Sequence, residues 1–249
     1  EVRSMNDYTF TIVIPTHNEE KYIAKCIKAV RRAEKNVPDD NVQILVVLNR
    51  CTDRTEEIAR KYGADVIYNS EKCLSKIRNA GVKAAKGRFI VTIDADSMMP
   101  YNALSKIKSM LESNEYIGGG ARPKFERMSL GILITEIYIV LKLLPIIKKS
   151  GGILSATMFW FRKTDFELLG GFNEELVSVE DADFAKRLKA LGDSKNMKYG
   201  VIKKPSVITS SRKFDEFGDW YLLKNRNLTK AILTGYNKKA ADKFYYDVR

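Results

Sequence analysis

The sequence predicts an α/β fold in which helices flank a mostly parallel central sheet, with a smaller subregion toward the C-terminus. Two observations predict it. Over the first hundred residues, short apolar runs rich in β-branched residues alternate with segments of helical periodicity, as in parallel sheets joined by crossover helices. The chain has 249 residues, of which 45% are hydrophobic, and this is enough for one large core. Because no repeat or linker interrupts it, we expect a single domain over residues 1–249.

The elements of the first half follow from these patterns in order. Apolar runs at 9–14, 42–48, 64–68 and 89–93 predict four buried strands. Apolar residues spaced three and four apart predict a helix after each of the first three strands. Asp53 followed by Glu56 resembles a capping box at the start of the second of these helices.

The second half begins with a helix that carries Leu104, Ile107 and Leu111 on one face. The glycine run at 118–120 predicts a close approach of the backbone to another group. Further on we expect a helix at 128–149 that is apolar almost all round, a strand at 157–161 and a helix at 180–191 that begins near Glu180. A second strand at 207–213 runs into a basic turn, and a helical C-terminal region follows from residue 220 onward.

Charge and cysteine content narrow the function classes. The net charge of +12 suits a phosphorylated substrate, an anionic membrane surface or nucleic acid, but the basic residues are scattered, which disfavours nucleic acid. Three cysteines without CxxC spacing indicate a reducing compartment. His17 is the only histidine, which excludes a histidine pair. We find no signal peptide at the start, so we expect a cytoplasmic protein.

The apolar stretch at 130–147 allows three interpretations. It contains Glu136, Lys142 and Pro145, and these residues disfavour a membrane span of such marginal length. The stretch is then a buried helix, a wall of an acceptor site, or a surface that contacts lipid. The last interpretation predicts a peripheral protein on the cytoplasmic face of a membrane.

Carboxylates lie at two places where a ligand is expected. Asp94 and Asp96 follow the strand at 89–93, and ligands of open α/β sheets bind beyond the carboxyl ends of strands. Two such carboxylates suit a Mg²⁺-like cation, although a solvated turn would look the same. Asp181 falls on the packed side of its helix near the N-terminus, whereas Asp183 falls on the solvated side. Asp181 is therefore either a partner of the helix dipole or a functional base.

Three ordered segments carry a resemblance to a known family. They are residues 12–20 (IVIPTHNEE), 94–96 (DAD) and 170–174 (GGFNE) leading to Glu180-Asp181. With Arg78-Asn79-Ala80-Gly81 between the first two, they resemble the GT-A fold glycosyltransferases of family 2, over roughly residues 8–211. The resemblance implies an inverting, metal-dependent transfer of one sugar from a nucleoside diphosphate sugar, expected to be a UDP-sugar. It also implies a nucleotide-sugar-binding half at about 8–121 and an acceptor-binding and catalytic half at about 122–249.

The same resemblance assigns roles to residues. Asp96 would bind Mn²⁺ or Mg²⁺, with Asp94 as a second ligand, and Asp181 would be the catalytic base beside Glu180. Asn49 stands where the family usually has an aspartate that contacts uracil, which leaves the base preference open. Arg212 and Lys213 would hold the diphosphate, or else form a solvated basic turn. The full set of expected nucleotide-sugar contacts is Pro15, Thr16, His17, Glu19, Asn49, Arg78, Asp94, Ala95, Arg212 and Lys213.

Two other function classes remain as alternatives. A nucleotidyltransferase that makes sugar nucleotides would need a glycine-rich basic loop after the first strand, but residues 15–20 contain no glycine. A non-catalytic module that binds nucleotide sugars or nucleic acid would explain the charge but not the two acidic sites. The sequence leaves the acceptor open among glycans, lipid-linked molecules and small molecules.

Overall fold

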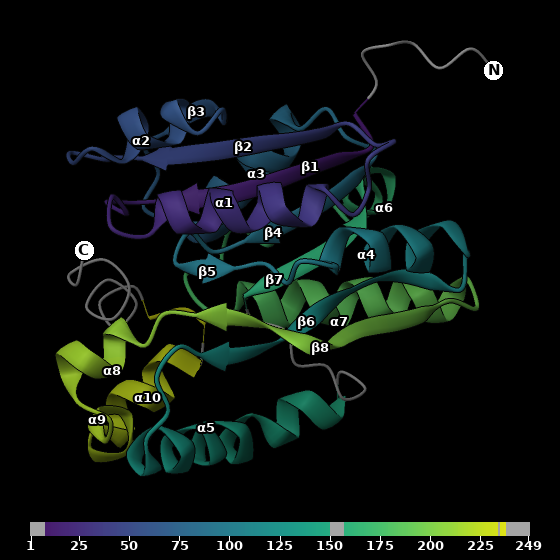
Figure 1. The fold of residues 1–249 in the computed structure, drawn as a ribbon. Coiled ribbons are helices and arrows are strands. Elements are labelled where there is room, and N and C mark those ends of the chain that lie inside the picture. Colours follow the sequence, from purple (N-terminus) through teal and green to yellow (C-terminus); the bar gives the residue numbers. More distant parts are fainter. Residues whose placement is uncertain (1–7, 150–156, 234, 238–249) are drawn as a thin grey trace.

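The computed structural model describes residues 8–149, 157–233 and 235–237. One sheet runs through the molecule with helices on both of its faces (Figure 1). Its strand order is β3-β2-β1-β4-β7-β6-β8-β5. The strands are β1 (Phe10–Thr16), β2 (Val42–Asn49), β3 (Asp65–Asn69), β4 (Phe89–Ile93), β5 (Ser97–Met98), β6 (Tyr116–Phe125), β7 (Met158–Arg162) and β8 (Lys198–Thr209). The helices are α1 (Ile23–Glu34), α2 (Thr55–Lys61), α3 (Leu74–Ala84), α4 (Ala103–Glu112), α5 (Leu130–Lys149), α6 (Lys163–Leu168), α7 (Glu180–Ser194), α8 (Arg212–Phe217), α9 (Tyr221–Lys224) and α10 (Arg226–Leu233).

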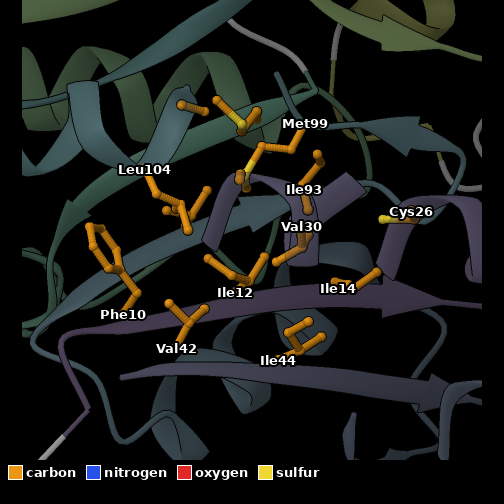
Figure 2. Packing of buried hydrophobic residues seen from close by; sticks show 14 of the residues in the cluster. Phe10, Ile12, Ile14, Cys26, Val30, Val42, Ile44, Ile93, Met99 and Leu104 are labelled. Atoms are coloured by element: carbon orange, nitrogen blue, oxygen red, sulfur yellow. The ribbon is translucent and has the colours of Figure 1, made fainter. Parts of the chain in front are cut away.

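The first four long strands form the parallel half of the sheet. Strand β1 lies between β2 and β4 and pairs with both in parallel, so that Ile12 is opposite Ile44 on one side and Val91 on the other. This confirms the predicted alternation of strands and helices. Side chains of β1 alternate between two cores: Ile12 packs in the core that includes α1 and α4, shown in Figure 2, while Val13 packs in the core that includes α3 and α7.

This arrangement determines where the loops meet. Since β1, β2 and β4 are parallel, the loops that follow them leave the same edge of the sheet. These loops begin after Thr16, Asn49 and Ile93. Strand β1 continues one residue past Pro15, which is opposite Val47 in β2, whereas the apolar run predicts a strand that ends at residue 14.

The second half of the sheet is mixed. Strand β7 is antiparallel to both β4 and β6, and β8 is parallel to β6. A side chain on Gly119 would collide with the carbonyl oxygen of Gly200 and with the indole of Trp160. The glycine run therefore permits the close approach that the sequence predicted.

Two elements differ from the sequence-based expectation. Strand β8 is 12 residues long and begins at Lys198, well before the predicted start near Val207. Lys203, Lys204 and Pro205 interrupt its apolar pattern, but β8 pairs with β6 on both sides of this interruption. After β8, Arg212 opens helix α8 rather than lying in a turn that ends a strand.

The predicted capping box at α2 is also wrong in part. The Asp53 carboxylate accepts hydrogen bonds from the backbone N–H of Thr55 and of Glu20, both at 3.0 Å. The Glu56 carboxylate does not return to the helix start and instead accepts from Arg60 and Tyr68. Asp53 thus joins the loops after β1 and β2.

Helices α5, α8, α9 and α10 gather at one end of the molecule, away from α1 to α3 (Figure 1). Within the described residues, no helix is both long and apolar enough to cross a membrane. Helix α5 is attached to this group through its N-terminal half: Ser129 and Thr135 donate hydrogen bonds to Asp219, just before α9.

Candidate active site

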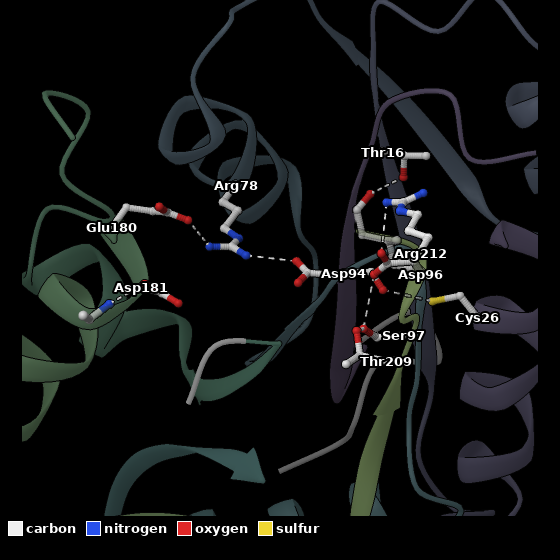
Figure 3. A network of polar contacts seen from close by, with 12 residues as sticks. Thr16, Cys26, Arg78, Asp94, Asp96, Ser97, Glu180, Asp181, Thr209 and Arg212 are labelled. Carbon is white, nitrogen blue, oxygen red and sulfur yellow. Dashed lines mark hydrogen bonds and ion pairs between the residues drawn. The ribbon is translucent and has the colours of Figure 1, made fainter. Parts of the chain in front are cut away.

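Arg78 bridges the two halves of the candidate site. It lies on the buried face of α3, where its guanidinium donates to Asp94 Oδ1 at 3.0 Å and to Glu180 Oε1 at 2.5 Å (Figure 3). Its side chain and that of Glu180 are almost completely buried, at 4% and 6% exposure. Burial opposes the charge of Arg78, but the carboxylates of Glu180 and Asp94 outweigh it and raise its pKa. One cation therefore connects the end of β4 to the start of α7.

The acidic turn, which carries Asp94 and Asp96, is bonded to segments from the second half of the chain. The backbone N–H of Asp94 donates to the carbonyl of Thr157 at 3.3 Å, and the Asp96 carbonyl accepts from Ser210 N–H at 3.1 Å. Ser97 Oγ lies 3.0 Å from Thr209 Oγ1. Strands from the second half of the chain thus fix the backbone of the acidic turn on both sides.

Arg212 is the partner of Asp96. Its guanidinium makes two bonds of 2.6 Å to the Glu19 carboxylate and lies 2.9 Å from Asp96 Oδ2. It also lies over the Tyr22 ring, 5.2 Å from the centroid. Burial opposes the charge, but Glu19 and Asp96 raise the pKa of Arg212 above its already high ordinary value. The loop after β1, the acidic turn and the start of α8 therefore meet at one guanidinium.

Asp181 lies beside Glu180 in the first turn of α7. Its Oδ1 accepts from the backbone N–H of Ala182 at 2.7 Å. Burial and the negative charge of Glu180 raise the pKa of Asp181 well above that of an ordinary aspartate, and the nearby Arg78 opposes this rise. Asp183 instead forms an ion pair of 2.8 Å with Arg187, and both aspartates are half-buried.

The residue that opens α7 has an unusual backbone. Val179 adopts the left-handed conformation, with φ of 54°, which is costly for a β-branched residue. Neighbouring segments hold this turn: Gly235 accepts from the N–H groups of Val177 and Ser178, and Ser75 donates to the Leu176 carbonyl at 3.2 Å. The position of Glu180 and Asp181 is thus enforced from both sides.

Asn49 and His17 meet at the ends of β2 and β1. His17 Nδ1 is 2.6 Å from the Asn49 carbonyl, which can only accept, so Nδ1 donates. The buried Asn49 amide donates to the carbonyls of Asn69 and Glu71 at 2.7 and 2.9 Å, and its oxygen accepts from Arg50. The Asn49 side chain therefore joins the loops around the end of β2. The next residue, Arg50, carries the charged side chain at this position, and its backbone is in the left-handed conformation with φ of 50°.

The structure brings most of the predicted residues to one edge of the sheet. Glu19, Asp96 and Arg212 form one ion-paired group, and Arg78, Asp94 and Glu180 form another. The remaining predicted residues lie in or next to these loops: Pro15 and Thr16 in the last residues of β1, Ala95 buried between the two aspartates, and Lys213 half-buried in the first turn of α8.

Sequence reasoning did not assign a role to Asn79. Its amide forms two hydrogen bonds with the backbone of Phe172, donating to the carbonyl at 2.9 Å and accepting from the N–H at 2.8 Å. The side chain thereby joins the segment at 78–81 to the segment at 170–174. The signal was present, since both segments belonged to the family resemblance, but their contact spans 93 residues of chain.

The acidic turn fits a divalent cation that substrate oxygens help to hold. In the part of the chain that the structure describes, no group of three or more His, Cys, Asp or Glu side chains is arranged for a metal. Mg²⁺-like ions, however, often take one or two carboxylates and share phosphate oxygens with the substrate. Asp96 supplies such oxygens at 13% side-chain exposure, and Asp94 lies two residues away at 31%.

Comparison with known proteins identifies the family. Residues 11–170 match the model of glycosyl transferase family 2. Over 206 residues the chain is 25% identical to the minor teichoic acid biosynthesis protein GgaB of Bacillus subtilis (strain 168), covering 79% of this chain and 22% of that protein. The chain spans only 22%, 25% and 65% of the length of the first three curated relatives.

Solved structures confirm the fold. S. aureus TarS 1-349 in complex with UDP-GlcNAc aligns with a TM-score of 0.60 at 17% identity, covering 96% of this chain and 71% of that one. The mannosyltransferase PcManGT from Pyrobaculum calidifontis, in complex with GDP-Man and Mn²⁺, aligns with a TM-score of 0.60 at 17% identity, covering 96% and 70%. The α/β fold with a mostly parallel central sheet is therefore the GT-A fold. The chain belongs to the family 2 glycosyltransferases.

Proposed function

We propose that this chain transfers one sugar, with inversion, from a nucleoside diphosphate sugar to an acceptor hydroxyl. Asp181 is the general base, and Asp96 holds a divalent cation, Mn²⁺ or Mg²⁺, with Asp94 near it. Residues 8–121 bind the donor, and residues 122–249 supply the base and the acceptor site.

One observation carries this proposal: the Arg78 bridge between Asp94 and Glu180. It ties the acidic turn, where the diphosphate is expected, to the helix that carries Asp181. Burial and the charge of Glu180 raise the pKa of Asp181, while the neighbouring Arg78 limits this rise. A base whose pKa lies closer to the working pH transfers protons more effectively.

The chain's own groups account for the expected reaction. The acceptor hydroxyl attacks the anomeric carbon while its proton passes to the Asp181 carboxylate. The bond from that carbon to the diphosphate breaks, and its electron pair leaves with the nucleoside diphosphate. Arg212 lies close to Asp96 and can stabilise the growing negative charge. A bound divalent cation at Asp96 would supply further positive charge to the same leaving group.

We propose a UDP-sugar as the donor. PcManGT was solved with GDP-Man and TarS with UDP-GlcNAc, so both nucleotides deserve a direct comparison. The side-chain amide of Asn49 is already hydrogen-bonded to Asn69, Glu71 and Arg50. We therefore expect Arg50 and the backbone near it, rather than Asn49, to contact the base.

The test is donor hydrolysis across a panel of UDP- and GDP-sugars, with and without Mn²⁺, on the wild-type chain and on Asp181→Asn. We expect one nucleotide series to be hydrolysed only with the metal. Asp181→Asn should bind the donor normally by calorimetry and lose turnover by about 10²–10⁴-fold. Asp183→Asn, two residues further along α7, is the matched control and should remain active. Full turnover by Asp181→Asn would rule out its role as the base.

A further inference from the structure

Helix α5 presents a regular stripe of large aliphatic side chains to solvent. Leu130 and Leu141 are 69% and 58% exposed, and Ile137 between them is 50% exposed. Because exposed positions recur at intervals of three and four, they lie along one side of the helix. The outer stripe is defined by Leu130, Leu133, Ile134, Ile137, Val140 and Leu141. Monomeric soluble proteins seldom expose such a continuous row.

The opposite side of α5 holds the helix in place. Ile132 and Thr135 are completely buried, and Thr135 Oγ1 donates to the Asp219 carbonyl at 2.7 Å. A side chain on Gly131 would contact the Trp220 indole. The helix is therefore docked on the α8–α10 end of the molecule by Gly131, Ile132 and Thr135, which leaves the outer stripe facing away from the protein.

Basic side chains are exposed on α5 and on the helices beside it. Residues 220–237, which include α9 and α10, contain three basic residues and no Asp or Glu. Lys224, Arg226 and Lys230 are all exposed there, and Lys142 is exposed on α5 itself. Figure 1 shows α9 and α10 beside the N-terminal half of α5.

Two acidic residues next to the N-terminus of α5 are neutralised, whereas Glu126 and Glu216 at the same end are exposed. Asp215 and Asp219 both pair with Arg127, at 2.7 Å in each case. Glu136, the one acidic residue of α5, is half-buried, and Arg122 opposes the rise that burial causes in its pKa. The combination of an aliphatic row, an exposed Trp220 and neighbouring basic residues is typical of surfaces that lie in the interface of anionic membranes.

We propose that the outer stripe of α5, with Lys142, Lys224, Arg226 and Lys230, docks the protein on an anionic phospholipid surface. The aliphatic side chains enter the boundary of the acyl chains, and the basic residues contact the lipid phosphates. A protein partner suits the composition less well, since lysine is depleted at protein interfaces. The proposal does not depend on the identity of the donor or on Asp181.

The test is flotation of the full chain with vesicles of phosphatidylglycerol and phosphatidylcholine, compared with vesicles of phosphatidylcholine alone. We expect binding to the anionic vesicles that falls with added salt. Two variants separate the contributions: Leu133→Gln with Ile137→Gln and Leu141→Gln, and Lys224→Gln with Arg226→Gln and Lys230→Gln. Each should lower the partition coefficient by at least about tenfold, with unchanged circular dichroism.

Matched controls use exposed residues of other elements. Leu168→Gln removes an aliphatic side chain that is 66% exposed on α6, and Lys25→Gln with Arg32→Gln and Lys83→Gln removes three exposed basic residues of α1 and α3. Neither control should alter binding. The proposal is overturned if the wild-type chain does not float with anionic vesicles, if the controls reduce binding as much as the variants do, or if the outer stripe instead makes a dimer that Ile137→Gln dissociates in light scattering.

Discussion

The two aspartates of the acidic turn serve different arginines. Asp94 pairs with Arg78, which is buried within α3, and Asp96 pairs with Arg212 at the start of α8. This division follows from the turn after β4, in which residues two apart leave the backbone in different directions. The site therefore holds its charges in two groups, and each can be tested separately.

The Arg78 group should be sensitive to the loss of a single partner. Arg78→Met leaves the Glu180 carboxylate buried without its cation, and we expect the free energy of unfolding to fall by about 3–5 kcal/mol. The double variant Arg78→Met with Glu180→Gln should recover most of this loss. Urea denaturation measures both. The exposed pair of Arg88 and Glu112 is the control, and Arg88→Met should cost at most about 1 kcal/mol. Equal losses at the two sites would contradict the buried bridge.

Asp181 should make activity depend on pH in a defined direction. The base form is the carboxylate, so turnover is lost as the pH falls through the raised pKa of Asp181. The acidic limb of the kcat profile should therefore lie above the range of an ordinary aspartate. Because Arg78 favours the carboxylate, Arg78→Lys should largely preserve the limb if it keeps the contact. A profile that is flat down to pH 5 would contradict this assignment.

The same pKa has a consequence for stability. A carboxyl group whose pKa is higher in the folded state binds its proton more tightly there than in the unfolded state. Proton binding by this group therefore stabilises the fold at low pH, and this stabilisation is lost as the pH rises through the folded-state pKa. Asp181→Asn removes this charge and should raise the melting temperature by roughly 2–4 °C at pH 8. The gain should shrink toward pH 4. Differential scanning calorimetry in EDTA tests this, and destabilisation at pH 8 would refute it.

At the scale of elements, the sequence predicts what is local and periodic. The four strands and three helices before Ile93 follow from apolar patterns and are confirmed. Strand β8 could not be predicted in full, because the exposed Lys203, Lys204 and Pro205 lie at an irregularity in the ladder, and β8 pairs with β6 on both sides of it. The bond between Arg78 and Glu180 likewise spans 102 residues, a distance at which no pattern in this one sequence indicates contact.

The seating of α3 depends on one missing side chain. A Cβ on Gly81 would overlap Val13 of β1 and approach Val47 of β2 to 2.8 Å. Gly81→Ala should therefore push α3 from the sheet and lower the free energy of unfolding by about 1–3 kcal/mol. Since α3 carries Arg78, donor binding should weaken as well. Val13→Ala makes room for the added methyl group, so the double variant should regain part of both losses. Absence of any rescue would mean that the contact is not the cause.

At the scale of the whole molecule, one ion pair joins the loop after β1 to the start of α8 at the edge of the sheet where the candidate site lies. Glu19 and Arg212 lie 193 residues apart in sequence and are bonded twice at 2.6 Å. Family resemblance indicated that both contact the donor, but it could not indicate that they contact each other. Arg212 lies 2.9 Å from one oxygen of the proposed cation ligand Asp96.

This arrangement predicts that the cation and the nucleotide bind together. Without nucleotide, Mn²⁺ must compete with the Arg212 guanidinium for Asp96, so calorimetry should detect weak binding that UDP or GDP strengthens. Arg212→Gln with Glu19→Gln removes the competitor without leaving the buried Glu19 carboxylate unpaired. This variant should bind Mn²⁺ on the order of tenfold more tightly in the absence of nucleotide, because a hydrogen bond to a charged group contributes roughly 1.5–3 kcal/mol. Adding Asp96→Asn to it should abolish the gain. If the double variant binds Mn²⁺ no better than the wild-type chain, Arg212 does not guard the cation site.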